Sequence, residues 1–445
     1  MRRTILAIAL APAILIFAAR TELRLIEIDP GHSHAAALHT TMLPGFSAEA
    51  HVYAPLGSDL NEHLNRIAQF NHRLKDPTHW ALKIYAGPDY LQRLREEPPG
   101  NVVVLSGRNE KKIDYIMEAL QDGQNVLADK PWIIEAENFS RLEAALNLAG
   151  EKGLIAYDCM TQRFDKAYQL QRELVGDRDI FGEPVPGTPD APSVRMENLH
   201  ALLKVGSAGP NRRPAWYFDI RQQGEGIADV GTHLVDLVEW TLFADQAIDY
   251  RRDVRVLRAE RSPLMLTREQ FSRVTGETAW PEFLTSVVKD DRLEYFTNSV
   301  AVFSIRGINV YLKVRWEYEA APGAKDSYFA GYQGSRSRIE LREGATEHYV
   351  PEVFVIPSPE SRAAVLSKLK SRLPHFDFEQ SGKDIHVIIP PRNRTPDDQY
   401  FPLLVERFLG YVHNPKTIPI WEKPNMIAKY YVTTKAVQLA REGRP

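Results

Sequence analysis

The sequence has almost no cysteine, no large charge excess and none of several short motifs that mark common enzyme classes. Cys159 is the single cysteine among 445 residues, which excludes an internal disulfide and a cysteine-based metal site. The formal net charge is −3 and no basic block is present, so nothing indicates a nucleic-acid partner. The patterns GKS/T, HExxH and GxSxG do not occur. We therefore expect neither a nucleic-acid partner nor a bound metal ion.

Long apolar runs are also absent, apart from one at the N-terminus. Met1, Arg2 and Arg3 precede the run TILAIALAPAILIFAA, which is shorter than the ~20 residues that a membrane-spanning helix needs. A positive start before a short apolar core is typical of a secretory signal. Phe17 stands where a cleavage site favours a small residue, which leaves an uncleaved N-terminal anchor as the alternative. We predict a signal peptide over residues 1–19 and export to the periplasm.

The rest of the chain is long enough for two domains. In the first part, short and continuously apolar segments alternate with segments of helical spacing, which is typical of right-handed βαβ units. The predicted strands are residues 23–29, 48–55, 80–87, 101–107, 124–131 and 154–160. We predict a dinucleotide-binding, Rossmann-type, doubly wound parallel sheet over residues 22–160.

The pattern changes after the Pro- and Gly-rich segment GEPVPGTPDAP. Later segments alternate polar and apolar residues or are rich in Val, Ile and Tyr, which predicts strands at 193–203, 298–305, 308–320, 337–343 and 349–356. Two helices are expected at 401–414 and 425–442, and residues 358–384 are interpreted as a surface insertion. We predict a C-terminal α+β domain over residues 161–445, with a mostly antiparallel open sheet, for substrate binding and oligomerisation.

One helical segment carries charges beside its apolar face. Residues 224–240 read GEGIADVGTHLVDLVEW. Asp229, His233, Asp236 and Trp240 share one face, because positions i, i+4, i+7 and i+11 align on an α-helix. An apolar face lies about 100° away, so we expect the charged groups at the rim of a buried cleft. Spacing alone leaves two alternatives open, Asp229 as a helix cap and His233 as a core histidine.

The carboxyl ends of the parallel strands are the expected place for a ligand. A dinucleotide fold usually has GxGxxG after its first strand, and this chain has Asp29, Gly31 and His34 at the three glycine positions. Only the middle glycine remains, and such a pattern does not by itself specify a dinucleotide. At the fifth strand end, Pro131 restricts Lys130 to extended geometry, so the ammonium group should project into the crevice.

Taken together, several segments resemble a known family. They are NVLADKP, YDCMTQRF, RPAWYFD and QGEGIADVGTHLVDLVEW, within a match that runs from about residue 22 to the C-terminus. The sequence is similar to the glucose–fructose oxidoreductase, inositol dehydrogenase and rhizopine catabolism (Gfo/Idh/MocA) family, whose EKP motif appears as Asp129-Lys130-Pro131. HVYAPLG and NMIAKYYVTTKA resemble, more narrowly, an exported subgroup with a "putative oxidoreductase C-terminal" domain. Lys112 stands where many members have histidine.

The resemblance implies an NAD(P)-dependent oxidoreductase in which a hydroxyl of a sugar or glycoside loses hydride to a bound nicotinamide. His233 would be the general base, because the ordinary pKa of histidine is about 6.5. Lys130 would stabilise the developing alkoxide as a fixed positive charge. Asp229 would orient His233 or bond a second hydroxyl.

Further site residues follow from the same resemblance. Residues at the strand ends would bind NAD or NADP, namely Gly31, His32, Ser33, His34, Arg108, Asn109, Asp129 and Lys130. Polar and aromatic residues of the second half would bind the carbohydrate, namely Arg163, His200, Lys204, Trp216 and Asp236, with Asp219 as a further candidate. Each of these has an alternative as a packing or surface residue. A homo-oligomer is expected.

Three functions remain open at this point. The first is a sugar dehydrogenase, and the second is a redox-neutral glycosidase that oxidises C3 transiently. The third is a sugar-binding module that has lost its cofactor site, as Asp29 and His34 suggest. An exported dehydrogenase would meet no free nicotinamide pool, so we expect a tightly held dinucleotide, with Arg108, Asn109 and Lys130 compensating for the missing glycines.

Overall fold

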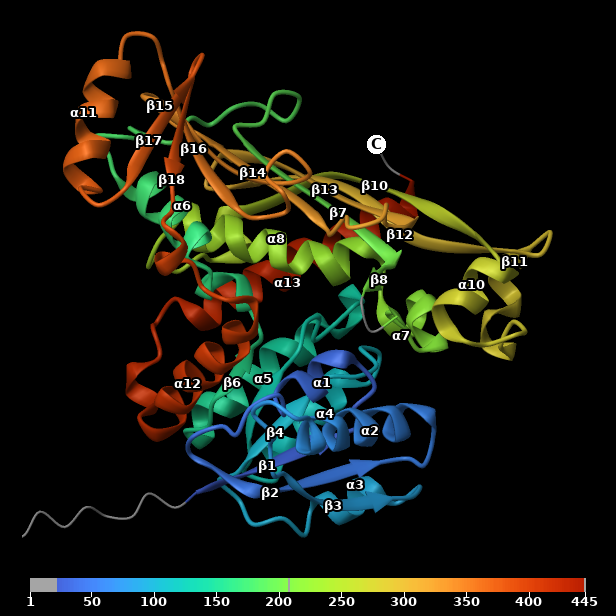
Figure 1. The fold of residues 1–445 in the computed structure, drawn as a ribbon. Helices are drawn as coiled ribbons and strands as arrows, with labels where there is room; N and C mark the ends of the chain where they lie inside the picture. Colours follow the sequence, from blue (N-terminus) through green and yellow to red (C-terminus); the bar gives the residue numbers. More distant parts are fainter. Residues whose placement is uncertain (1–21, 207–208, 444–445) are drawn as a thin grey trace, which may run out of the picture.

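The computed structural model describes residues 22–206 and 209–443, which form two β-sheets with helices around and between them (Figure 1). The predicted signal over residues 1–19 lies outside the described residues. Within those residues, no helix combines the length and the apolar character needed to cross a membrane.

The first sheet is parallel and has the strand order β3-β2-β1-β4-β5-β6. Its central strands are continuously apolar because helices cover both faces, and every residue of β4 is buried. This confirms the predicted Rossmann-like sheet. The strands are β1 (Leu23–Ile28), β2 (Phe46–Ala54), β3 (Ala81–Ala86), β4 (Val102–Leu105), β5 (Asn125–Ala128) and β6 (Ala156–Asp158). The helices are α1 (Ser33–Ala37), α2 (Ser58–His72), α3 (Tyr90–Leu94), α4 (Lys112–Gln121) and α5 (Phe139–Lys152).

The second sheet has ten strands and is mostly antiparallel, as predicted, with the order β10-β12-β13-β7-β14-β15-β16-β18-β17 and β11 beside β12. Only β13 and β7 run parallel to each other. The strands are β7 (Val194–Leu203), β10 (Val254–Thr267), β11 (Val288–Lys289), β12 (Arg292–Ile305), β13 (Ile308–Glu319), β14 (Ser327–Gln333), β15 (Ser337–Glu343), β16 (Glu352–Pro357), β17 (Asp377–Ser381) and β18 (Asp384–Ile388). A short pair, β8 (Val205–Gly206) and β9 (Gly209–Pro210), stands apart from it.

The prediction for this region missed two strands and misassigned one segment. The sequence patterns missed β10 and β14. The segment 358–384 is part of the sheet and not a separate insertion, because β18 pairs with β16 and β17 pairs with β18. It also contributes α11 (Arg362–Arg372), which buries Val365 and Leu369. The smaller helices of this half are α6 (Lys166–Gly176), α7 (Ile220–Gln223), α9 (Tyr250–Asp253) and α10 (Arg268–Thr275).

Two long helices, α8 (Gly226–Leu242) and α13 (Glu422–Glu442), lie between the two sheets (Figure 1). The N-terminus of α8 approaches β12 so closely that a Cβ on Gly226 would lie 1.9 Å from the carbonyl oxygen of Thr297. The glycine therefore serves packing against a strand, not the approach of a ligand. The last helices return to the first sheet, since Phe408 of α12 (Tyr400–His413) packs in one cluster with Leu25 and Val104. The domain boundary at residues 160 and 161 stays a prediction.

Candidate active site

A cleft of about 1500 Å³ lies between the carboxyl ends of the parallel strands and the second sheet. It is large enough for a ligand well above drug size. It is lined by many of the sequence-predicted site residues, namely Gly31, His32, Ser33, His34, Lys130, His200, Lys204, Asp229 and His233. Other predicted residues lie behind this lining, as described below.

Lys130 and Asp229 form an ion pair at one wall of the cleft. Tyr217 donates a hydrogen bond from its hydroxyl to Asp229 Oδ2 at 3.1 Å. Burial opposes the ionisation of Asp229, but the Lys130 ammonium outweighs it and holds the pKa of Asp229 well below its ordinary value. The N-cap position of α8 is Glu225, so Asp229 is not the N-cap. The Asp229 carboxylate therefore holds the Lys130 ammonium group in place at the cleft.

His233 faces the same cleft, one turn further along α8. Burial, and then the nearby Lys130 ammonium, lower the pKa of His233 from 6.5 to about 3. Its Nδ1 is buried and has no hydrogen-bond partner among the described residues. The ordinary pKa assumed from the sequence therefore does not hold here. His233 is a neutral imidazole at physiological pH and a weak base.

Arg163 and Asp236 do not reach the cleft lining, in contrast to the expectation from sequence. Asp236 Oδ1 accepts hydrogen bonds from Arg163 Nη2 at 2.6 Å and from Lys429 Nζ at 3.0 Å. Arg163 also pairs with Glu422 at 3.0 Å. Glu422 and Lys429 belong to α13, so this buried network fastens α8 to α13, and the substrate-binding prediction for Arg163 and Asp236 has no support from their position.

Three further predicted residues also lie outside the cleft lining, namely Trp216, Arg108 and Asn109. Their side chains make contacts between the two halves of the molecule. Trp216 Nε1 donates to Asp59 Oδ2 at 2.9 Å, and Arg108 Nη2 lies 2.9 Å from the same oxygen. The Arg108 guanidinium also lies over the Trp216 ring, 5.3 Å from its centroid. Asn109 Nδ2 donates to the carbonyl oxygen of Gln223 at 2.7 Å. Their side chains are therefore engaged by protein and not directed to a ligand.

A second polar and aromatic group lines the cleft from the strands of the second sheet. Asp326 Oδ2 lies 2.8 Å from His200 Nδ1 and 2.5 Å from Lys204 Nζ. The His200 ring stacks on Trp316, with 4.8 Å between centroids. Asp326 and Trp316 were not found from the sequence, because no spacing pattern links them to His200. The remaining candidate, Asp219, caps α7 and bonds Arg221.

The β1–α1 turn tests whether these residues fit a dinucleotide. Asp29 has a φ of 45°, so it keeps the left-handed backbone that the first glycine of a GxGxxG motif adopts. The amides that should cradle the diphosphate are engaged, however: those of Gly31 and His32 both donate to the carbonyl oxygen of Ser106 at 3.1 Å. A Cβ on Gly31 would lie 3.3 Å from Trp216, whose ring covers the turn. The cleft has room for a dinucleotide, but the turn does not fit its diphosphate.

One imidazole, that of His34, stands at the third glycine position, and that of His32 lies two residues before it. Asp129 Oδ2 lies 2.9 Å from His34 Nδ1 and 3.5 Å from His32 Nδ1. We call His32, His34 and Asp129 the cleft triad. The sequence showed these histidines only as an eroded fingerprint, although the His-x-His spacing at 32–34 was visible.

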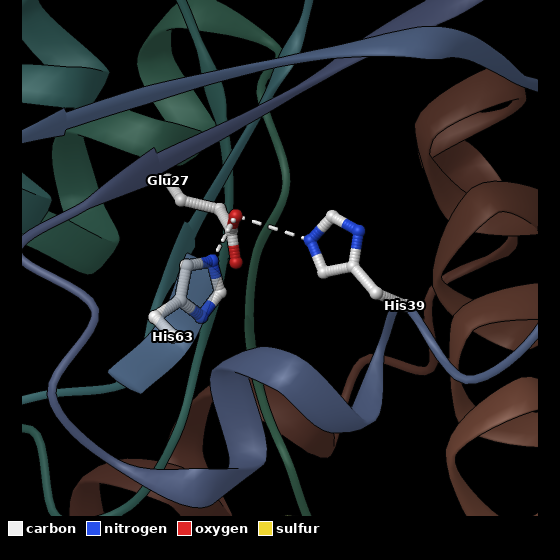
Figure 2. A group of neighbouring side chains, drawn as sticks. All are labelled: Glu27, His39 and His63. Atoms are coloured by element: carbon white, nitrogen blue, oxygen red, sulfur yellow. Dashed lines mark hydrogen bonds and ion pairs between the residues drawn. The ribbon is translucent and has the colours of Figure 1, made fainter. Parts of the chain in front are cut away.

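A second group with the same residue types lies in the core of the parallel sheet (Figure 2). Glu27 Oε2 lies 3.1 Å from His39 Nε2 and 2.9 Å from His63 Nε2. We call Glu27, His39 and His63 the core group. Their side chains are at most 3% exposed, although His63 also contributes to the cleft wall. This group was not found from the sequence.

Comparisons with known proteins place the chain among oxidoreductases. Residues 170–441 match the family model described as "Putative oxidoreductase C terminal domain". A crystal structure described as a "putative oxidoreductase" from Parabacteroides merdae is 39% identical, with a TM-score of 0.91, and the match covers 95% of this chain and 98% of that chain. The search of curated proteins gave no match.

More distant solved structures share the fold. Levoglucosan dehydrogenase, in complex with NADH and L-sorbose, is 12% identical with a TM-score of 0.61, and the match covers 94% of this chain and 97% of that chain. A mutant of KijD10, a 3-ketoreductase from Actinomadura kijaniata in complex with TDP-benzene and NADP, is 12% identical with a TM-score of 0.56, and the match again covers 94% and 97%.

Proposed function

The chain belongs to the family defined by the "putative oxidoreductase C-terminal" domain, and we propose that it is an oxidoreductase acting on a hydroxyl or carbonyl group of a carbohydrate. One observation carries this proposal. The Lys130–Asp229 pair and the neutral His233 converge on a cleft that is also lined by His200, which is stacked on an indole. Convergent polar groups beside an aromatic face suit a polyhydroxylated ligand.

Lys130 has the central role in this proposal. Its ammonium group is held by Asp229, which is itself held by Tyr217, so the positive charge is positioned before substrate binds. A preorganised charge stabilises the negative oxygen that develops when a hydroxyl is oxidised or a carbonyl is reduced. His233 accepts a hydrogen bond from the same hydroxyl and orients it, and the proton that the hydroxyl loses on oxidation passes to solvent in the cleft.

The redox partner that we propose is NAD or NADP. A nicotinamide would accept or supply the hydride at C4 of its ring. Lys130 and His233 are the residues that would lie beside the nicotinamide end. The distant relatives with NADH and NADP bound support this choice, and the engaged amides of the β1–α1 turn oppose tight binding through the usual cradle.

The wall formed by His200, Lys204, Asp326 and Trp316 is the proposed carbohydrate subsite. Asp326 keeps a carboxylate there, because the His200 ring and the Lys204 ammonium outweigh burial and hold the pKa of Asp326 below its ordinary value. A carboxylate bonds vicinal hydroxyls, and the Trp316–His200 stack offers a flat face to a sugar ring.

The β1–α1 turn favours one alternative, because its Gly31 and His32 amides already donate to Ser106. This alternative is a carbohydrate-binding module without a dinucleotide. Heat-denaturing the purified protein and assaying the supernatant for dinucleotide separates the two. Released dinucleotide, or saturable binding of added NAD or NADP, supports the oxidoreductase. If no dinucleotide is released or bound while a sugar still binds, the module replaces it. Export to the periplasm and assembly as a homo-oligomer remain further proposals.

A further inference from the structure

We propose that the cleft triad, His32, His34 and Asp129, binds a divalent metal ion of the zinc type at the floor of the cleft. Two imidazole nitrogens and one carboxylate oxygen already converge there, with Asp129 Oδ2 lying 2.9 Å and 3.5 Å from the two Nδ1 atoms. Ligand atoms that are each about 2.1 Å from a tetrahedral zinc ion lie about 3.4 Å apart. The convergence is therefore close to the geometry that an ion requires.

The two supporting elements hold this arrangement in place. His32 and His34 are placed at the start of α1. The His34 amide lies 3.4 Å from His32 Nδ1, a long contact that an ion bound at Nδ1 would replace. Asp129 follows β5, and its Oδ2 accepts from Ser106 Oγ at 3.2 Å. Lys112 Nζ donates to the Asp129 carbonyl oxygen at 2.9 Å. Groups that orient the ligands in this way are a regular part of protein metal sites.

The carboxylate also has a lone pair to offer. Asp129 Oδ1 is buried and has no hydrogen-bond partner among the described residues. A buried carboxylate oxygen without a partner is costly, and a metal ion bound through one or both oxygens would satisfy it. This observation is independent of the distances within the triad.

The site opens to the cleft. The His32 and His34 side chains are 21% and 37% exposed, and both line the cleft. Three protein ligands with the remaining position turned to a substrate cleft are the arrangement of catalytic zinc, whereas structural zinc is enclosed by four ligands. The open position would take an oxygen atom, from a carbohydrate hydroxyl or from a diphosphate.

Metal binding at the cleft triad does not depend on the proposed function. Only the effect of the ion on a bound carbohydrate or dinucleotide rests on it. An ion at the triad would place positive charge where the Gly31 and His32 amides are engaged. It would also polarise an oxygen bound beside Lys130, because a zinc ion lowers the pKa of a bound water from 15.7 to about 7.

The core group is the competing place for an ion, and its geometry suits one less well. Both imidazoles approach one oxygen, Glu27 Oε2, as in the cleft triad, and Glu27 Oε1 is likewise buried without a partner among the described residues, so the difference lies in the outer ring nitrogens. The outer nitrogens, His39 Nδ1 and His63 Nδ1, are buried without partners among the described residues. An ion there would leave both N–H groups unsatisfied, whereas metal-bound histidine normally donates its outer N–H.

The test is a titration of chelator-treated full-length protein with Zn²⁺ alone, followed by calorimetry. We expect one ion per chain, and at least tenfold weaker binding in His34→Ala and in the near-isosteric Asp129→Asn. His72→Ala, at an exposed position of α2, is the matched control and should bind like the wild type. Visible absorption of bound Co²⁺ should show a low-coordinate site that both triad variants lose.

Three results would overturn the inference: no stoichiometric ion in the wild type, unchanged affinity in both triad variants, or loss of the ion in His63→Ala instead. Circular dichroism establishes that each variant is folded, and Asp129→Asn provides a second reading if His34→Ala unfolds. Zinc binding without carbohydrate turnover would contradict only the proposed function. Full turnover by a protein that binds no ion would contradict only this inference.

Discussion

The cleft triad and the core group have the same composition, two histidines and one carboxylate, but they lie in different surroundings. In the core group (Figure 2), both imidazoles lie against one oxygen of Glu27 in the interior of the first sheet. In the cleft triad, His34 is 37% exposed and faces the cleft of about 1500 Å³. The difference teaches that residue type alone does not assign a role. A group that is open to a cleft can bind a ligand, whereas a group enclosed in the core contributes to the stability of the fold.

The largest expected effect concerns the cleft. Lys130→Met should lower turnover of the carbohydrate substrate at least 100-fold, because the positive charge at the reacting oxygen is lost. It should also reduce the free energy of unfolding by roughly 3 kcal/mol, because Asp229 stays buried without its partner. Steady-state kinetics and urea unfolding measure the two effects.

The double variant Lys130→Met/Asp229→Asn separates these two roles. It should recover most of the stability and none of the turnover. If turnover returned together with stability, Lys130 would be a structural residue. A cleft residue would then have the stabilising role that we assign to the core group.

The next effect concerns the core. Glu27→Ala should reduce the free energy of unfolding by about 3 kcal/mol, because two buried imidazole N–H groups lose their acceptor. His34→Ala should reduce it by less than about 1 kcal/mol, since that ring is partly exposed. Urea denaturation of the two variants makes the comparison, and equal losses would remove the distinction between the groups.

Acid should affect the core group at a predictable pH. Burial opposes the ionisation of Glu27, but His63 and His39 outweigh it and lower its pKa from 4.5 to about 2. Because the pKa of the folded state is depressed, the carboxylate contributes its full stability above about pH 4.5 and loses it as the pH falls toward 2. The loss amounts to roughly 3 kcal/mol.

Unfolding of wild type and Glu27→Gln, followed between these two pH values, measures this contribution. The stability difference between the two proteins should shrink as the pH falls. A difference that stays constant through this range would show that the Glu27 carboxylate is not stabilised by its imidazole neighbours.

The smallest effect concerns His233. Its pKa of about 3 predicts that it stays neutral at every pH well above that value. Replacement by Gln should lower kcat/KM only about fivefold to tenfold, as for one lost hydrogen bond. The wild-type to variant ratio should be constant between about pH 5 and 8. A ratio that changes near pH 6.5 would restore His233 as an ordinary general base.

The fold could be predicted because its signals are local. Apolar runs such as 101–107 are buried on both faces of the parallel sheet, and their alternation with helical segments is visible in the sequence. Strand β10 was missed because Arg258, Glu260 and Arg261 interrupt its apolar pattern. A segment with so many charges has no clear strand signal until its neighbour β12 is known.

The site could be predicted only where a residue follows a recognisable strand end or helix pattern. Lys130, Asp229 and His233 met that condition, and the structure brings all three to one cleft. Asp326 and Trp316 did not, because their proximity to His200 depends on the pairing of β7 with β13 and β14. Tertiary pairing of this kind is not encoded in any local spacing.

The most direct test of the account is turnover in the cleft. Purified protein is incubated with NAD or NADP and a panel of mono- and disaccharides and their 3-keto derivatives, and the absorbance of the reduced nicotinamide is followed. We expect a carbohydrate-dependent change in absorbance in the wild type that is lost in Lys130→Met/Asp229→Asn and retained in Glu27→Gln. No change with any carbohydrate, from a protein that also binds neither dinucleotide, would contradict it.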